Sequence, residues 1–282
     1  MRLPIIFVGM HRSGTSMLAG LLKKMGVFLG YGVQHNESIF FNQLNLYIER
    51  VCNCGWDNPE PIKYLYDSSP IRELVLKYLH KTLTGPEVSL YFGPLRWRKL
   101  IPKKIWPKCS LKSIDRPWGW KDPRNTFTAE LWKELFPDAK FLHIYRNGVD
   151  VAASLRQREF DLLGKRPLDE PHSSPRCFSL QSAFDLWALY VEKAFSLTSE
   201  VGRNNILHIR YEDLLKNPLV ILKEVVKFCD INVSEDSLVK NLTSIDSKRA
   251  YKFLEDKELK EFYLKVKDHP SMRRLGYSNI IL

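Results

Sequence analysis

Small polar and basic residues follow directly after the first apolar run of the chain. The stretch FVGMHRSGTSMLAGLL, residues 7–22, contains Gly9 and Gly14, which allow a tight turn and a close approach of the backbone to a ligand. The apolar-periodic segment that follows would begin with free amides, and the dipole of such a helix favours an anion at that end. Arg12 adds a planar, permanently charged group suited to oxyanions. The pattern predicts an anion-binding loop, whose candidate contacts are Arg12, Ser13, Gly14, Thr15 and Ser16.

Arg146 and Ser154 form a second candidate pair. Both belong to YRNGVDVAAS, residues 145–154, in which Arg146 ends an apolar run expected to be a strand and Ser154 lies in the next helix. Open α/β folds bind ligands at the carboxyl edge of the sheet, so the two side chains could hold a second phosphate there. An arginine at a strand end is also a common surface salt-bridge partner, and the pair alone leaves that alternative open.

A third group of charged residues stands in WGWKDPRN, residues 118–125. Lys121 and Asp122 precede a proline, so we expect them in an extended or turning segment. A lysine at this point could reach into the anion site. The alternative is a surface loop with a local network of lysine, aspartate and arginine. Taken alone, this segment favours the surface loop.

Short apolar runs alternate with longer periodic segments along the chain. The expected elements are strands at 4–9, 141–146 and 206–214, helices at 14–25, 148–160, 179–201 and 218–229, and a helical pattern at 36–54, with Gly26 ending the first helix. Residues 85–118 are irregular, and the proline-rich 164–178 is a loop or flap. Strands alternating with helices predict an α/β fold: a single domain with a P-loop-like parallel sheet flanked by helices.

Composition restricts the class of partner. The 282-residue chain has a formal charge of +11, which favours an anionic partner, although a solvated basic surface would give the same charge. We find no apolar run of membrane-spanning length, and the opening MRLPIIFVG is too short for a signal-peptide core, so we expect a cytoplasmic protein. The five cysteines suggest neither a disulfide framework nor a zinc set.

Taken together, the motifs resemble those of the sulfotransferases that use 3′-phosphoadenosine 5′-phosphosulfate (PAPS). The chain is most similar to the broad bacterial branch of that family, which is itself similar to the tyrosylprotein and carbohydrate sulfotransferases. HRSGTSML resembles the family's 5′-phosphosulfate loop, WKDPR its Lys-Asp-Pro segment and YRNGVDVAAS its 3′-phosphate motif. LWALYVEKA, IRYEDLLKNP and the final MRRLGY also look like family segments in the right order. One departure is Gly148, where many relatives have proline.

The resemblance implies a sulfuryl transfer from PAPS to a hydroxyl acceptor, with PAP as product and without a metal. Arg12 and Lys121 would stabilise the developing charge during an in-line displacement. A base within reach of the acceptor hydroxyl is also required, and the family analogy selects Glu37 in HNESIFFNQLN, with His35 as the second choice. Glu37 would otherwise be a carboxylate at the start of a helix.

Two other classes of function remain open from the sequence. A P-loop kinase or NTPase is disfavoured because Thr15 stands where its lysine belongs and because FLHIYR ends in arginine instead of a metal-binding aspartate. A nucleic-acid-binding module is disfavoured because the basic residues are dispersed and no RNP-like, KH-like or zinc-finger pattern is present.

The motifs do not determine which acceptor the protein uses. We expect residues 56–118 and 156–180 of the domain at 1–282 to build its pocket or a lid. Aromatic residues there suit the sugar rings of a glycan or a glycosylated metabolite, but they also suit apolar alcohols, and core packing is their commoner use. These aromatics are Trp56, Tyr64, Tyr66, Tyr91, Phe92, Trp97 and Trp106. The sequence leaves the oligomeric state open.

Overall fold

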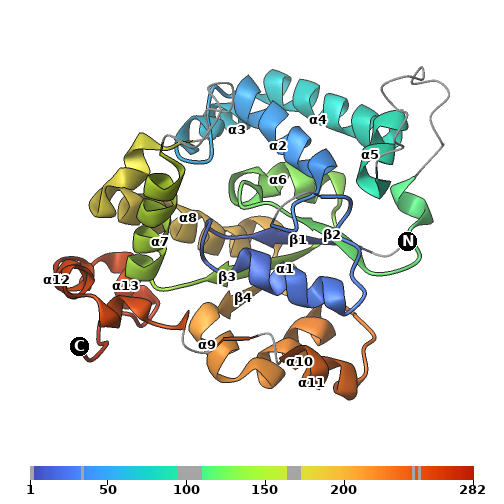
Figure 1. Cartoon of the computed structure of the whole chain (residues 1–282). Coiled ribbons are helices and arrows are strands. Elements are labelled where there is room, and N and C mark those ends of the chain that lie inside the picture. The colour runs from blue at the N-terminus through green and yellow to red at the C-terminus, as the bar shows by residue number, and fades with distance from the viewer. Residues whose placement is uncertain (1–2, 33–34, 94–109, 164–172, 243–244, 247–248) are drawn as a thin grey trace.

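The sheet is the frame that positions the candidate residues. The computed structural model describes residues 3–32, 35–93, 110–163, 173–242, 245–246 and 249–282. In this part of the chain, four parallel strands pair in the order β2-β1-β3-β4 (Figure 1). They are β1 (Pro4–Val8), β2 (Trp118–Lys121), β3 (Lys140–Tyr145) and β4 (Ile206–Arg210). Every residue of β1 and β2 is buried, as is typical of parallel strands that helices cover on both faces.

Helices of very different length surround the sheet. The α-helices of the described residues are α1 (Thr15–Lys24), α2 (Ile39–Val51), α3 (Lys63–Asp67), α4 (Ser69–Thr84), α5 (Ser89–Phe92), α6 (Asn125–Leu135), α7 (Gly148–Leu162), α8 (Leu180–Val201), α9 (Tyr211–Lys216), α10 (Pro218–Phe228), α11 (Glu235–Leu242), α12 (Lys257–Val266) and α13 (Pro270–Arg274). Single-turn 3₁₀ helices lie at Glu60–Ile62, Pro86–Val88, Leu111–Ser113, Pro175–Phe178, Arg203–Asn205 and Lys252–Glu255.

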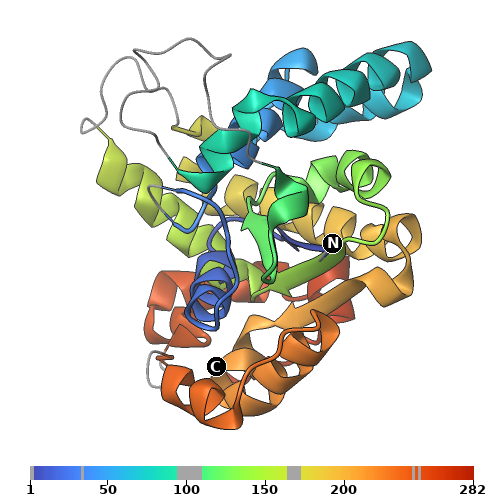
Figure 2. The same ribbon diagram turned by 90° about the vertical axis from the view of Figure 1, so that its right-hand side faces the viewer.

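The two faces of the sheet belong to different apolar cores. Ile5 and Phe7 share a core with residues of α1, α9, α10 and α11. Ile6 and Val8, one position along, share the other core with residues of α2, α4, α6 and α8. This alternation follows from the two-residue period of a strand. Figure 1 shows α10 and α11 on one side of the sheet and α6, α2 and α4 on the other, and the view in Figure 2 places α4 (cyan) and α10–α11 (orange) at opposite ends of the molecule.

The strand register brings the chemistry-bearing segments to one edge. Phe7 of β1 pairs with Lys121, and the next residue, Val8, pairs with His143 of β3. Tyr145, just before Arg146, pairs with the last residue of β4. The anion loop, the Lys-Asp-Pro turn and Arg146 therefore all leave the sheet at its carboxyl edge, where open α/β folds bind ligands.

The structure confirms the α/β single domain and most of its predicted elements. Lys121 and Asp122 lie in an extended and then turning segment, as expected, because Lys121 ends β2 at the edge of the sheet and the chain turns directly after it. One predicted boundary was wrong. The strand predicted to reach residue 214 ends at Arg210, because YEDLLK forms α9 with acidic residues in its first turn.

The close packing of α8 against α7 explains why residue 148 is a glycine. It is the first residue of α7, and a Cβ atom on it would lie 2.6 Å from the ring of Trp187. The indole nitrogen of Trp187 in turn donates to the carbonyl oxygen of Arg146, at 3.0 Å. The missing side chain therefore lets α8 pack closely beneath Arg146.

The segments expected to build the acceptor pocket are only partly described. Residues 94–109 and 164–172, which include Trp97 and Trp106, lie outside the described part of the chain. The rest of 56–118 forms α3, α4, α5 and β2 with their short connections. Within the described ranges, no helix is long and apolar enough to cross a membrane.

Candidate active site

A cleft of about 830 Å³ opens at the carboxyl edge of the sheet. Its walls come from the loop after β1, the end of β2, α7, and the C-terminal segment that leads into α12. The lining residues that the sequence singled out are Arg12, Gly14, Thr15, Ser16, His35, Glu37, Lys121, Arg146 and Ser154. Residues from distant parts of the chain are thus brought to one site.

The loop before α1 is shaped by its two glycines. Gly9 has a φ of 121°, and a Cβ atom there would lie 2.5 Å from the carbonyl oxygen of Ile144. Gly14 has a φ of 101°, and its Cβ would lie 2.4 Å from the ring of Tyr211. Helix α1 begins directly after Gly14 without a side-chain cap and without an acidic residue in its first turn. The first amides of α1 therefore offer donors to an anion in the cleft.

Arg12 lies between this loop and α7. Its Nε donates to the hydroxyl oxygen of Ser154 at 2.8 Å. Burial lowers the pKa of Arg12, and the nearby positive charges of Arg158, Arg146 and Arg249 lower it further. A guanidinium held among other cations favours an anionic ligand, because such a ligand relieves the mutual repulsion.

Arg146 is fixed from several sides. A terminal nitrogen of its guanidinium donates to Asp150 at 2.9 Å and to the carbonyl oxygen of Arg249 at 2.8 Å. The guanidinium also lies over the ring of Tyr211, 4.9 Å from its centre. Its Nε is buried and has no hydrogen-bond partner among the described residues. Arg146 is therefore held in place at the cleft while one donor stays unpaired.

Lys121 and Glu37 form an ion pair on the opposite wall of the cleft. The Lys121 Nζ lies 2.6 Å from Glu37 Oε1, and the two backbones are joined by an isolated parallel bridge. The other carboxylate oxygen of Glu37 accepts from Asn42 at 3.3 Å. The Lys121 side chain is 3% exposed and that of Glu37 is 23% exposed. The amine is thus largely withdrawn from solvent, and the carboxylate remains reachable from the cleft.

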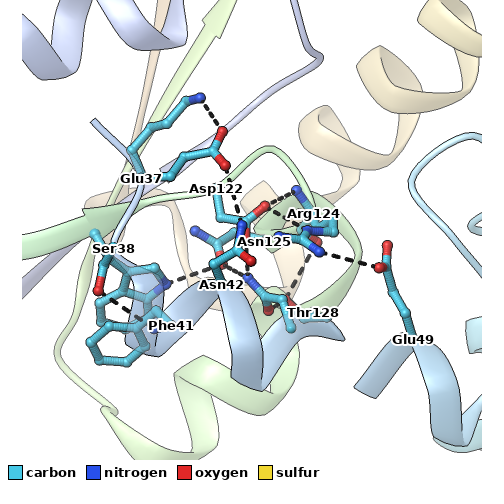
Figure 3. Close-up of polar contacts among 12 residues, drawn as sticks. Glu37, Ser38, Phe41, Asn42, Glu49, Asp122, Arg124, Asn125 and Thr128 are labelled. Atoms are coloured by element: carbon cyan, nitrogen blue, oxygen red, sulfur yellow. Dashed lines mark hydrogen bonds and ion pairs between the residues drawn. The ribbon is translucent and has the colours of Figure 1, made fainter. Parts of the chain in front are cut away.

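A buried polar network surrounds Asp122, the residue that follows Lys121 in the chain (Figure 3). Asp122, which is 1% exposed, accepts two side-chain bonds from Arg124, at 2.9 and 2.8 Å, and one from Asn45 at 2.9 Å. Arg124 also reaches Glu49 at 3.4 Å. Burial raises the pKa of Glu49 to about 7 against the opposing charge of Arg124. The network joins α2 to the turn after β2, and it rules out the surface-loop alternative for WGWKDPRN.

Asn45 has all its polar groups satisfied within this network. Its amide nitrogen also donates to Asn125 Oδ1 at 2.8 Å, and its oxygen accepts from Thr128 at 2.9 Å and from the indole of Trp132 at 3.2 Å. Fully satisfied buried networks of this kind rigidify their surroundings. The turn that carries Lys121 therefore has a fixed position relative to α2.

Ser13 is the one candidate that the cleft does not include. It is 1% exposed, and its hydroxyl oxygen has no hydrogen-bond partner in the described part of the chain. Its amide donates to the carbonyl oxygen of Met10 at 3.2 Å and closes the turn of the loop. In this structure Ser13 shapes the loop and does not line the cleft.

Several lining residues were missed by sequence reasoning. Among them are His11, Arg158, Tyr211, Arg249 and Lys252. Arg158 stands one helical turn after Ser154, so the period of α7 could have indicated it. His11 is the residue before Arg12, and burial and the surrounding cations lower its pKa well below the usual value. Arg249 and Lys252 carry no recognisable signal, because only the tertiary fold brings the C-terminal segment to the cleft.

The described aromatics expected for an acceptor pocket do not line this cleft. Trp56 packs between the His11 ring, at 4.8 Å between centres, and the Arg158 guanidinium, at 4.6 Å. The hydroxyl of buried Tyr91 donates to the carbonyl oxygen of Gly119 at 2.5 Å, so this residue is part of the core. Two residues of the stretch 156–180, Gln157 and Arg158, do line the cleft.

No group of three or more His, Cys, Asp or Glu side chains is placed to hold a metal ion within the described residues.

The fold and the loop define an α/β protein of P-loop-like architecture, and comparison with known proteins gives its family. A profile described as "Sulfotransferase family" matches residues 4–235, and the chain therefore belongs to that family. The match covers the anion loop, the Lys-Asp-Pro turn and the Arg146–Ser154 segment.

Individual relatives are more distant. The chain is 27% identical over 111 residues to protein-tyrosine sulfotransferase A of Caenorhabditis elegans, a match that covers 39% of this chain and 27% of the relative. It is 26% identical over 118 residues to protein-tyrosine sulfotransferase 2 of Gallus gallus, covering 42% of this chain and 29% of the relative. The matched stretches thus span less than a third of the length of these curated relatives.

Solved structures of sulfotransferases share the fold. A sulfotransferase from Alicyclobacillus acidocaldarius superposes with a TM-score of 0.52 at 16% identity, over 99% of this chain and 98% of the other. The sulfotransferase domain of the Synechococcus PCC 7002 olefin synthase gives a TM-score of 0.51 at 16% identity, over 100% and 98% of the two chains. At this level of identity the likeness concerns the fold alone.

Proposed function

We propose that the protein transfers a sulfuryl group from PAPS to a hydroxyl group of an acceptor. The observation that carries this proposal is the convergence of three features in one cleft. They are the uncapped start of α1 with Arg12, the cleft-lining side chains of Arg146 and Ser154, and the ion pair of Lys121 and Glu37. Family membership supports the same reaction class.

The donor end of the cleft fits a nucleotide with two separate anionic groups. The first amides of α1 and Arg12 would hold the 5′-phosphosulfate, since both lie at the loop between β1 and α1. Arg146 and Ser154 would hold the 3′-phosphate, since both side chains line the cleft and a guanidinium makes strong charge-assisted hydrogen bonds to phosphate. When bound, PAPS supplies the sulfuryl group and leaves as PAP.

The opposite wall would carry out the proton and charge transfers. Glu37 would take the proton of the acceptor hydroxyl as the oxygen attacks sulfur. Lys121 would stabilise the charge that develops on the bridging oxygen as the bond to sulfur breaks. His35 also lines the cleft and remains the second choice for the base. Because side chains and amides supply the positive charge, we expect activity to survive EDTA.

Ligand binding tests the donor assignment and separates the alternatives. We expect PAP to raise the melting temperature, whereas ATP with magnesium and a DNA oligomer should have little effect. A shift by ATP alone would favour a kinase or NTPase, and a shift by DNA alone would favour a nucleic-acid-binding module.

The acceptor requires a screen. We propose a glycan or glycosylated metabolite as acceptor, and radiolabelled PAPS offered with sugars, phenols and aliphatic alcohols tests that choice. Phenols belong in the panel because curated relatives are named protein-tyrosine sulfotransferases. Transfer to phenols without transfer to sugars would overturn the glycan assignment.

A further inference from the structure

The backbone just before Glu37 adopts a costly conformation. His35 has a φ of 52° and Asn36 a φ of 60°, so two consecutive non-glycine residues are left-handed. Such residues are uncommon and persist only where their surroundings enforce them. Asparagine tolerates this region better than most residues because its short amide can bond locally. The approach to Glu37 is therefore held by specific contacts.

The contact that holds Asn36 comes from α1. The Asn36 side-chain amide donates to the carbonyl oxygen of Ser16 at 3.1 Å. Ser16 lies in the first turn of α1 and lines the cleft at the donor end. One turn further along α1, Gly20 leaves room for the same amide, since a Cβ atom there would lie 3.3 Å from Asn36 Nδ2. The surface of α1 thus accommodates Asn36 closely.

The next two residues attach the same segment to other elements. Glu37 joins the end of β2 through its ion pair and backbone bridge with Lys121. The hydroxyl oxygen of Ser38 accepts from the amide of Phe41 and caps α2. Three consecutive residues therefore fix this segment to α1, β2 and α2 in turn. The link through Asn36 is the one that leads to the proposed donor loop.

We propose that Asn36 is a positioning residue that couples the donor-binding turn of α1 to the proposed base Glu37. This inference rests on the sulfotransferase function proposed above. A phosphosulfate held at the start of α1 fixes the turn that contains Ser16. The bond from Asn36 then fixes the carboxylate of Glu37 relative to that turn, so that the base faces the hydroxyl when the donor is in place. Asn36 itself contributes to the rate and not to donor affinity.

The test reaction needs no identified acceptor, because water can take the place of the hydroxyl. The bond between sulfur and the bridging oxygen breaks, and that oxygen keeps the electron pair. A new bond forms between sulfur and the water oxygen, Glu37 receives one proton of the water, and the hydrogen sulfate formed loses the other to solvent. The products are PAP and sulfate, which radiolabelled PAPS makes measurable.

Three variants remove or disturb the bond in different ways. Asn36→Asp keeps the tolerance for a left-handed backbone but replaces the donor by a carboxylate that faces the Ser16 carbonyl. Asn36→Gly deletes the side chain, while glycine still adopts the left-handed backbone conformation readily. Gly20→Ala crowds the amide from the side of α1, although alanine is favoured over glycine in a helix by about 1 kcal/mol. The gain in helix propensity opposes the cost of crowding, so Gly20→Ala should fold, which keeps the test decisive if an Asn36 variant folds poorly.

The matched control is Asn53, another left-handed asparagine, with a φ of 49° and a place outside the cleft. We expect each of the three test variants to release sulfate about tenfold more slowly at saturating PAPS, because a misplaced catalytic group costs rate. The calorimetric Kd for PAP should stay within twofold, and Asn53→Gly should match the wild type in both measurements.

Two results would overturn the inference. One is a wild-type rate in both Asn36→Gly and Gly20→Ala. The other is a loss of PAP affinity equal to the loss of rate, which would make Asn36 a support of the donor site alone. A wild-type protein that does not bind PAP would overturn the proposed function as well, so the two failures are distinguishable.

Discussion

The donor end and the reacting end of the cleft carry their positive charges in different ways. At the donor end, Arg12 donates to a neutral hydroxyl, that of Ser154, and burial and neighbouring arginines lower its pKa. At the reacting end, Lys121 donates to the carboxylate of Glu37 at 2.6 Å. The proposed donor end therefore keeps Arg12 on a neutral partner although Arg146 pairs with Asp150, whereas at the proposed reacting end the lysine and the carboxylate neutralise each other.

This difference indicates a division of labour. A preformed cationic site gains free energy as soon as a polyanion binds, so donor affinity should depend on the donor end. The pair of Lys121 and Glu37 must exchange its mutual contact for contacts with the substrates before either residue can act. Its contribution should appear mainly in the transition state, and so in turnover.

Glu37→Gln should give the largest effect. We expect turnover to fall by roughly 10²–10⁴-fold, the usual contribution of a general base, while the Kd for PAP changes by no more than a few-fold. Steady-state transfer assays and calorimetry measure the two quantities. The exposed Glu60→Gln is the matched control. Near-full activity of Glu37→Gln would contradict the assignment of the base, and His35→Gln should then be made.

Lys121→Ala and Arg12→Ala should separate the two ends of the cleft. We expect Lys121→Ala to lower turnover by about 10²–10³-fold with PAP affinity nearly unchanged, because its contact strengthens as charge develops. Arg12→Ala should weaken both PAP binding and turnover, because the loop also holds the ground-state donor. Lys63→Ala, at an exposed lysine, serves as control. Parallel losses in the Lys121 and Arg12 variants would erase the distinction between the two ends.

Arg124→Ala should lower the free energy of unfolding by about 3–5 kcal/mol, because it leaves buried Asp122 and Glu49 without their partner. Chemical denaturation measures this change. Lys223→Ala breaks an exposed pair with Glu235 and should cost at most about 1 kcal/mol. Equal effects of the two variants would mean that the network around Asp122 does not stabilise the reacting end.

Acid should destabilise the fold through two histidines that do not line the cleft, in addition to His11. His143 of β3 and His208 of β4 lie 2.7 Å apart between their Nδ1 atoms. Burial lowers the pKa of His208 from 6.5 to about 4, and burial also lowers that of His143. Below pH 6.5 these histidines therefore bind protons more readily in the unfolded chain than in the folded chain.

The free energy of unfolding should therefore fall between pH 6.5 and about 4, by at most about 1.4 kcal/mol per pH unit for each histidine. Denaturant titrations across this range measure the slope. His208→Gln, which does not titrate, should make the profile flatter. An unchanged slope in His208→Gln would assign the acid sensitivity to other groups.

The sequence indicated the cleft residues of the proposed donor end more directly than those of the proposed reacting end, because the two groups differ in the range of their interactions. Gly9, Gly14 and Arg12 stand close together in the chain, and their chemistry is local to one strand-to-helix turn. Arg146 and Ser154 likewise share a single strand-to-helix segment. Residue types at short spacing are therefore sufficient to indicate these sites.

The reacting end depends on contacts between distant segments. Glu37 and Lys121 are 84 positions apart, and their backbones meet through β2, a four-residue strand whose sequence gives a weak strand signal. Asn45 and Asp122 are 77 positions apart, and nothing in WGWKDPRN alone indicates that the aspartate is buried. The segment WGWKDPRN alone therefore favours a surface loop. The packing of α2 against the turn after β2 shows instead that the aspartate is buried.

Calorimetric titration of PAP and AMP into the wild type and Arg146→Ala tests the central claim most directly, because the two nucleotides differ by the 3′-phosphate. Loss of a charge-assisted pair costs about 1–3 kcal/mol, so the wild type should bind PAP from several-fold to a few hundredfold more tightly than AMP. Arg146→Ala should bind both nucleotides about equally and keep the wild-type affinity for AMP. Equal affinities of the wild type for PAP and AMP would contradict the account, because the cleft would then hold no site for a 3′-phosphate.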